Sequence, residues 1–367
     1  PNAPKASIRA LLEAYDLGPG DVVFVDTGSY GLTANIPILV QDSGIRIQGP
    51  TNAGARAIIN RGNTATTSYV FDVQGADDVT LANLAITGAY LGVHSAADAG
   101  SLNFTLRDSE IFGNAWWGVG FYRGNTGASF LNNEIYQNGG SSNGGLFTYA
   151  AGSRATGNHV WSNGNYGLWA DNSVGGAFIE FVGNRVFSNV VGINEFSSRV
   201  ANNLIYANSD AGIVTGGSHT DAFDGIYNNT VRQLVGDAVR VEINAGTTFL
   251  RNNILSVDAG TIYRVALNSQ DNLNTDWNLL HVSGAGSVGL WSGLAYGSLA
   301  AWHYATGHDG ESAAGDPQFV DPDGADNQLG YSAAPSGVSA IVDDGDPGFA
   351  AIGTWTTRTA NATAYLT

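Results

Sequence analysis

Three carboxylates are the candidate catalytic groups of this chain: Asp171, Glu195 and Glu242. Each comes three or four residues after the small residue that opens an apolar run, as in residues 167–171. Glycoside hydrolysis requires two carboxylates about 5–9 Å apart, one as the acid and the other as base or nucleophile. If the apolar runs are neighbouring strands, Asp171 with Glu195 or Glu242 would form such a pair.

Aromatic side chains fall into the outward register of the same runs. Side chains alternate between the two faces of a strand, so every second residue of a run points away from the core. An exposed apolar patch of this size usually marks a binding surface, and flat rings beside amides and carboxylates suit sugar rings. The predicted glycan-binding residues are Tyr122, Phe147, Tyr149, Trp169, Asn194, Phe196 and Arg240.

Other interpretations of these residues stay open. The long C-terminal segment could lie over the aromatic side chains and bury them. Glu195 falls in the inward register, where a buried carboxylate needs a partner. Arg240 is expected to pair with Asp237 or Glu242 rather than to bind an acidic sugar.

The sequence predicts no cofactor. The histidines lack the spacing of a zinc site, and phosphate-binding loops are absent. Ca²⁺ needs six to eight oxygen ligands, and the weak candidates for these are Asp321, Asp323 and Asp326. Without an EF-hand-like register, solvated turns are the other interpretation of these aspartates.

The elements that position these side chains are predicted by a recurring asparagine. One series lies two residues before an aliphatic residue, at spacings of 25, 26, 19, 26 and 24: Asn133, Asn158, Asn184, Asn203, Asn229 and Asn253. A second series falls three residues after the aliphatic of its own repeat: Asn114, Asn138, Asn163, Asn189 and Asn208. Such a period indicates one unit stacked on itself. It fits one rung of a parallel β-helix, with asparagines in left-handed corners and bonded along the axis.

The predicted fold is all-β, a single right-handed parallel β-helix with an N-terminal capping helix and a loop-rich C-terminal cap. Residues 5–16 have helical spacing of apolar side chains and are stopped by Gly18-Pro19-Gly20. We expect residues 1–20 to form the N-terminal cap, 21–275 the rungs, and 276–367 the last rungs and the C-terminal cap. All belong to one domain.

Composition limits the partners. The chain has 32 acidic and 15 basic residues and a net charge of −17, so nucleic acid and anionic membranes are excluded as partners. No run of about 18 apolar residues could span a membrane. The chain begins without methionine, and we interpret it as a mature or excised segment of a longer precursor.

Several segments carry a resemblance to a known family. They are Gly18–Tyr30, which looks like a first coil, Asp276–Leu280, which looks like a late strand, and Ser298–Trp302 with Gly315–Pro322, which look like a closing segment. On these the chain resembles the bacterial right-handed parallel β-helix repeat proteins of pectate-lyase-like architecture. That resemblance implies the fold but not one activity, because the superfamily includes lyases, epimerases, glycoside hydrolases and non-catalytic surface modules.

The motifs of the catalytic subgroups are missing. The sequence has no Arg-x-Pro-x-x-Arg segment, no Asn-Thr-Asp set and no Asp-Pro-His-Glu segment. The leading hypothesis is therefore an extracellular or cell-surface module of a larger bacterial protein that engages a polysaccharide without catalysis. A second hypothesis is a carbohydrate-active enzyme, more a glycoside hydrolase than a lyase. A third is a structural spacer or filament module that packs against neighbouring modules.

Overall fold

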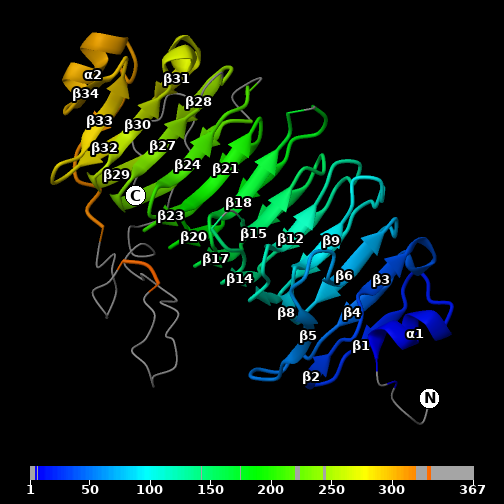
Figure 1. Cartoon of the computed structure of the whole chain (residues 1–367). Coiled ribbons are helices and arrows are strands. Elements are labelled where there is room, and N and C mark those ends of the chain that lie inside the picture. Colours follow the sequence, from blue (N-terminus) through cyan, green and yellow to red (C-terminus); the bar gives the residue numbers. More distant parts are fainter. Residues whose placement is uncertain are drawn as a thin grey trace, which may run out of the picture. The chain divides into compact units, whose positions relative to one another are not determined.

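The computed structural model describes residues 5, 7–141, 143–173, 175–219, 224–242, 245–319 and 329–331. It divides into two compact units, residues 1–184 and 185–367. Within each unit, short strands stack into three sheets, and successive strands of a sheet come from successive turns of the chain (Figure 1). The predicted all-β parallel solenoid is confirmed.

The first unit builds three sheets, each with strands from every third element of the chain. Sheet A contains β1 (Val22–Phe24), β4 (Arg46–Gln48), β7 (Thr80–Ala82), β10 (Thr105–Arg107), β13 (Ser129–Leu131), β16 (Arg154–Thr156) and β19 (Glu180–Val182). Sheet B contains β2 (Gly28–Gly31), β5 (Ala57–Asn63), β8 (Ala85–Ala89), β11 (Glu110–Phe112), β14 (Glu134–Tyr136) and β17 (His159–Trp161). Sheet C contains β3 (Ile36–Leu39), β6 (Tyr69–Gln74), β9 (Leu91–Ser95), β12 (Trp117–Phe121), β15 (Gly144–Thr148) and β18 (Tyr166–Asp171).

The second unit repeats this arrangement. Its sheet A contains β22 (Arg199–Ala201), β25 (Ile226–Tyr227), β28 (Thr248–Arg251) and β31 (Leu273–Asp276). Its sheet B contains β20 (Arg185–Phe187), β23 (Leu204–Tyr206), β26 (Thr230–Val235), β29 (Ile254–Ala259), β32 (Leu279–Val282) and β35 (Ala313–Ala314). Its sheet C contains β21 (Val191–Phe196), β24 (Ala211–Thr215), β27 (Asp237–Val241), β30 (Thr261–Val265), β33 (Ser287–Trp291) and β34 (Leu294–Tyr296).

Aliphatic side chains of equivalent positions stack inside the rungs. In sheet C of the first unit the strand register aligns Val93 with Val119, Val119 with Leu146, and Leu146 with Leu168. All four are fully buried. The same alignment repeats from rung to rung in sheets A and B, so each short strand buries its inward side chain against two neighbours. This is why three-residue strands suffice.

The asparagine ladders form the corners, with one refinement of the prediction. Asn133 donates its Nδ2 to Asn158 Oδ1 at 3.0 Å, and Asn158 donates in turn to Asn184 at 2.9 Å. The ladder asparagines are buried and do not adopt the left-handed conformation. The residue before each one does, as at Asn132 with a φ of 53° and Gly157 with a φ of 68°. One corner residue therefore turns the chain, and the next satisfies the backbone.

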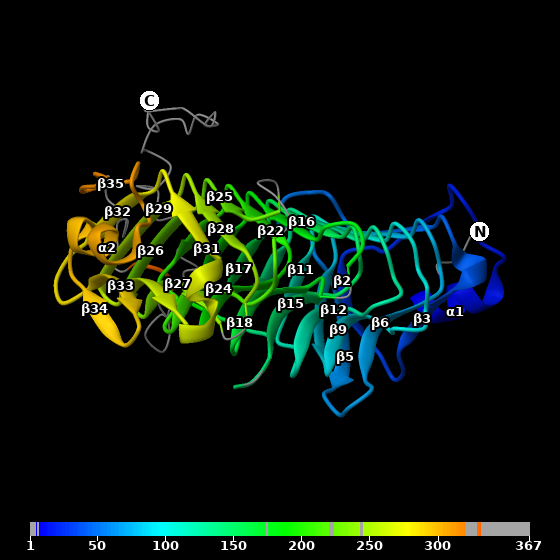
Figure 2. The same cartoon turned by 90° about the horizontal axis from the view of Figure 1, so that it is seen from above.

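Short helices cover the ends of the two units. In the first unit, α1 (Ile8–Ala14) follows Ser7, whose hydroxyl accepts from Ala10 N at 3.2 Å, and contacts β3. It is shorter than the predicted 5–16. In the second unit, η2 (Leu267–Asn272) precedes β31 and α2 (Leu299–Thr306) contacts β33 and β34 (Figure 2). No helix of the described residues is long and apolar enough to cross a membrane.

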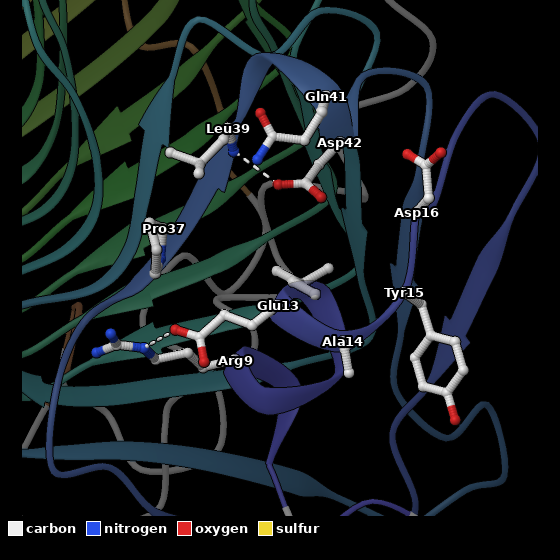
Figure 3. Close-up of a pocket in the computed structure, with 10 residues that line it drawn as sticks. Arg9, Glu13, Ala14, Tyr15, Asp16, Pro37, Leu39, Gln41 and Asp42 are labelled. Atoms are coloured by element: carbon white, nitrogen blue, oxygen red, sulfur yellow. Dashed lines mark hydrogen bonds and ion pairs between the residues drawn. The ribbon is translucent and has the colours of Figure 1, made fainter.

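A hollow of about 310 Å³ lies between α1 and the start of the solenoid (Figure 3). Its wall includes Asp42, of the short turn η1 (Val40–Asp42), whose carboxylate accepts from Leu39 N at 2.8 Å. Burial raises the pKa of Asp42. On the opposite wall Arg9 pairs with Glu13 at 2.7 Å. The polar groups of each wall bond within that wall, Arg9 with Glu13 in the helix and Asp42 with Leu39 in the turn.

Candidate functional site

The outward side of sheet C in the first unit carries a continuous aromatic cluster. Its centre is formed by the buried Leu91, Trp117 and Phe147. Partly buried rings surround that centre, so part of each of these rings reaches solvent. We call this surface the aromatic face, and its rings are Tyr69, Tyr90, Trp116, Trp117, Tyr122, Phe147, Tyr149, Tyr166 and Trp169.

The register of the strands brings these rings together. His94, Gly120, Phe147 and Trp169 occupy the same column on β9, β12, β15 and β18. Gly120 leaves a gap in that column. A Cβ atom at this position would meet Phe147 Cε1 at 2.5 Å and Leu91 Cδ1 at 2.9 Å. The ring of Phe147 therefore occupies the space over Gly120 and supports the rings around it.

The rings of the aromatic face pack in stacked and edge-on pairs. Tyr122 meets Phe147 edge-on, with ring centroids 4.8 Å apart, and Tyr166 lies 4.9 Å from Trp169. Trp117 and Tyr166 are nearly parallel, at 6.2 Å and 6°. Each such pair stabilises the folded protein by about 0.5–1.5 kcal/mol beyond the free energy gained by burying the surface of the two rings. The face is thus a rigid platform rather than a set of loose side chains.

The phenol hydroxyls of this platform are available to a ligand. In the part of the chain that the structure describes, no hydrogen bond involves the hydroxyl of Tyr69, Tyr90, Tyr122, Tyr149 or Tyr166. Each hydroxyl can donate one hydrogen bond and accept others. A ligand rich in hydroxyl groups would satisfy these hydroxyls while its apolar faces cover the rings.

The tyrosine hydroxyls also keep their protons over a wide pH range. Burial raises the pKa of Tyr122 to about 12, and the neighbouring tyrosines add to the effect. Burial raises the pKa of Tyr149 to about 12 as well, with the negative charge of Asp171 as a further cause. Both groups therefore remain neutral donors at physiological pH.

Two polar pairs border the rings. On β18, Asp171 accepts from Arg123 Nη2 at 2.8 Å, and the guanidinium lies over the ring of Tyr149 at 5.5 Å. On β6 and β9, Asp72 Oδ1 lies 2.7 Å from His94 Nδ1. The His94 ring stacks on Tyr69 with centroids 4.0 Å apart. Each carboxylate thus has a partner and a fixed orientation.

The structure brings four predicted site residues of the first unit together: Tyr122, Tyr149, Trp169 and Asp171. Phe147 belongs to the same cluster, but the prediction that it is exposed is wrong. Only 2% of Phe147 is accessible, because Gly120 beneath it lets the ring sink between its neighbours. Phe147 is therefore a supporting residue of the face rather than a contact surface.

The other predicted residues lie in the second unit. Phe196 packs over Gly216, where a Cβ would meet Phe196 Cε1 at 2.3 Å. Asn194 is buried, with 6% of its surface accessible. Glu242 is partly exposed, just beyond the end of β27. These side chains line sheet C of the second unit but do not form a comparable cluster of rings.

Arg240 is held by two aspartates. The predicted partner Asp237 accepts from its Nη2 at 2.8 Å, and Asp210 accepts from both Nη atoms at 2.8 Å. The predicted alternative partner, Glu242, is not used in the described contacts. Hydrogen bonds from Arg240 lower the pKa of Asp210. Arg240 is thus saturated within the protein, as predicted.

Glu195 is not a surface group. Its inward register is confirmed, since the side chain is fully buried. It accepts from Ser198 N at 3.0 Å and lies 3.2 Å from Nε2 of the buried His219. The proposed role of Glu195 as a partner of Asp171 in catalysis is therefore contradicted, because no glycan on the outer face could reach it.

Sequence reasoning missed several members of the aromatic face, including Trp117, Tyr166 and Tyr69. The prediction started each strand at its glycine, whereas Trp117 and Tyr166 come one residue earlier. The sequence does indicate these residues, because an equivalent position lies directly before the glycine of each rung. In successive rungs that position is Leu91, Trp117, Gly144 and Tyr166.

Metal binding finds no support among the described residues. None of them form a group of three or more histidine, aspartate or glutamate side chains placed to hold an ion. The candidate Ca²⁺ ligands Asp321, Asp323 and Asp326 lie outside the described residues.

Comparisons with known proteins agree with the fold. The fold defines the class, a parallel β-solenoid, and one sheet of the first unit carries the aromatic face. The family described as the right-handed beta helix region matches residues 43–225, and the fold of the chain is a right-handed parallel β-helix. No curated protein sequence matches the chain.

Solved structures share the fold at low identity. The pectate lyase Pel9A is 16% identical with a TM-score of 0.56, and the alignment covers 99% of this chain and 88% of that one. The A-module of the mannuronan C-5 epimerase AlgE6 of Azotobacter vinelandii is 15% identical with a TM-score of 0.54, covering 82% of this chain and 92% of the other. At these identities the likeness concerns the fold alone.

Proposed function

We propose that this chain is an extracellular or cell-surface β-helix module that binds a polysaccharide on the aromatic face of its first unit. The observation that carries the proposal is the set of five tyrosine hydroxyls, none hydrogen-bonded to a described residue, set among stacked rings. Exposed apolar patches on soluble proteins usually mark interaction sites. Rings with free hydroxyls match a ligand whose surface alternates apolar C–H faces and hydroxyl groups.

The positions of the carboxylates favour binding without catalysis. Asp72 and Asp171 lie on strands four spacings apart in sheet C, about 19 Å at about 4.8 Å per spacing. Glycosidases need their two carboxylates within about 10 Å. Asp171 is also paired with Arg123, and Glu195 is buried. Neither Asp72 nor Glu195 is therefore placed to serve as the carboxylate partner of Asp171.

The relatives of known structure give the proposal its context. A pectate lyase and a mannuronan epimerase are named for polysaccharides that they act on. We extend to this chain only the association with a polysaccharide, and the absence of the catalytic motifs from its sequence favours a binding role. Neighbouring modules of a longer chain are further proposed partners.

The experiment is a binding and activity screen of the whole chain against immobilised polysaccharides. Retention should be measured for the wild type, for Trp169→Ala and for Phe112→Ala, and the soluble fraction should be assayed for reducing ends and unsaturated products. Phe112 is the matched control, since this partly buried ring stacks on Tyr136 at 5.2 Å on sheet B of the same unit.

We expect retention on at least one glycan, loss with Trp169→Ala, no change with Phe112→Ala and no released product. Equal retention of both variants would refute the location of the site. Product release that Asp171→Asn abolishes would refute the non-catalytic role.

A further inference from the structure

We propose that the aromatic face recognises a neutral glycan and that His94 is its polar anchor, accepting a hydrogen bond from a sugar hydroxyl. This inference rests on the proposed function and specifies the class of ligand and the group that orients it. It is carried by the charges bordering the face and by the geometry of the pair formed by Asp72 and His94.

The charges on the face do not suit an acidic sugar. An acidic sugar is favoured by a net positive charge at its site, usually from arginine. The described residues place one arginine at this face, Arg123, and its charge is offset by Asp171, which accepts from its Nη2 at 2.8 Å, while the same Nη2 also bonds Ser173 Oγ at 3.0 Å. With Asp72 and Asp171 the local charge is −1, on a chain of net charge −17. A uronate polymer would be repelled.

The contact between Asp72 and His94 sets the tautomer of the neutral imidazole ring. A carboxylate only accepts hydrogen bonds, so the 2.7 Å contact with Asp72 Oδ1 places the ring proton on Nδ1 of His94. The second oxygen, Asp72 Oδ2, accepts from Gln74 Nε2 at 2.6 Å. In the neutral imidazole, Nε2 is then an acceptor, and it makes no hydrogen bond to a described residue.

The His94 ring is also fixed in place. It stacks on Tyr69 with centroids 4.0 Å apart and meets Tyr122 edge-on at 5.8 Å. Its side chain is 12% exposed, so part of the ring reaches the surface. A preorganised acceptor between two tyrosines is suited to a hydroxyl donor that lies across the rings. Sites built to hydrogen-bond a hydroxyl discriminate strongly against analogues lacking it.

The test measures binding of the full chain to neutral cello-, xylo-, manno- and laminari-oligosaccharides and to oligogalacturonate and oligomannuronate, by calorimetry. His94→Phe keeps a ring to stack on Tyr69 but removes the acceptor. Asp72→Asn keeps the size of the side chain but offers an amide that can donate as well as accept, so that the tautomer is no longer fixed. The matched control is His159→Phe, which alters a similar pair with Glu134 (3.1 Å) on sheet B.

We expect at least one neutral oligosaccharide to bind and the uronates not to bind. His94→Phe and Asp72→Asn should each weaken binding about five- to tenfold, the loss of one hydrogen bond, while His159→Phe leaves it unchanged. The ¹⁵N spectrum should show the neutral His94 ring as the Nδ1–H tautomer in the wild type and a changed tautomer in Asp72→Asn, a change that simple loss of packing would not produce.

Three outcomes would overturn the inference, and they separate it from the proposed function. If Trp169→Ala abolishes neutral binding but His94→Phe and Asp72→Asn do not weaken it, the anchor is wrong and the glycan face stands. If a uronate binds as tightly as any neutral sugar, the ligand class is wrong. If no glycan binds, the proposed function fails and the anchor fails with it.

Discussion

Replacing one ladder asparagine should destabilise the first unit far more than replacing its neighbour of the same type. The Asn133 side chain makes three buried hydrogen bonds: it donates to Leu106 O and Asn158 Oδ1, each at 3.0 Å, and accepts from Ser109 N at 3.1 Å. Because each hydrogen bond contributes about 1 kcal/mol, Asn133→Ala should lower the free energy of unfolding by about 3 kcal/mol. Part of this cost is the backbone N–H of Ser109, left buried without a partner.

The adjacent Asn132 is the matched control, because it is exposed and its role is to turn the chain at a φ of 53°. Asn132→Ala replaces a residue that tolerates the left-handed region by one that tolerates it less, at a cost of about 1 kcal/mol. The free energies of unfolding can be measured by urea denaturation with tryptophan fluorescence, at unchanged m-value. Equal costs for the two variants, or less than about 1 kcal/mol for Asn133→Ala, would refute the assignment of separate roles in the corner.

Three further predictions concern the face and the C-terminal cap. Gly120→Ala should cost about 1–3 kcal/mol in urea denaturation and weaken glycan binding, because the new Cβ would lie 2.5 Å from Phe147; Gly140→Ala, with nothing within 4 Å, should be neutral. Tyr122 and Tyr149 should titrate near pH 12 in ultraviolet difference spectra. Because the pKa of each group in the folded protein lies above the ordinary value of 10.0, the free energy of unfolding should be unaffected below about pH 10 and should fall as the pH rises toward 12. Titration of both groups near pH 10 would contradict their burial. Trp302→Ala should cost about 3–5 kcal/mol, since this buried ring stacks on Tyr263 and donates to Asp309 at 2.9 Å. Tyr304→Ala, at an exposed position of the same helix, should have no effect, and similar losses for the two would show that α2 does not anchor the cap.

The rungs and their corners could be predicted from the sequence because each rung obeys the same local rules. A left-handed residue, a buried asparagine and an inward aliphatic recur at short spacing, as at Asn132, Asn133 and Ile135. The period alone therefore gives the fold class, the inward columns and the face that carries Tyr122, Tyr149 and Trp169.

The full extent of the aromatic face could not be predicted, because strict alternation fails at the glycine that opens each strand. A Cβ on Gly118 would meet Asn138 Nδ2 at 2.9 Å, on the inner side. A Cβ on Gly120 would meet Phe147 on the outer side, and Trp117 joins the same outer cluster. Alternation counted from the glycine therefore leaves out the column that contains Trp117 and Tyr166.

The partners of charged groups that meet across different rungs could not be predicted from the sequence, although the pair of Arg240 with Asp237 within one strand could. Asp72 and His94 are 22 residues apart, and Asp210 and Arg240 are 30 apart. Each pair meets only because neighbouring strands of sheet C bring the two residues together: β6 and β9 for the first pair, and β27 and the residue just before β24 for the second. Likewise, the partner of Glu195 is His219, from another rung. A spacing in sequence does not specify which of several polar side chains will meet across a corner.

The most direct test of the central claim is a calorimetric titration of neutral oligosaccharides into the wild type, Trp169→Ala and Phe112→Ala. The account predicts saturable binding by the wild type, at least about tenfold weaker binding by Trp169→Ala, and wild-type affinity for Phe112→Ala. Equal affinity of all three proteins, or no binding of any glycan by the wild type, would contradict a glycan site on the aromatic face.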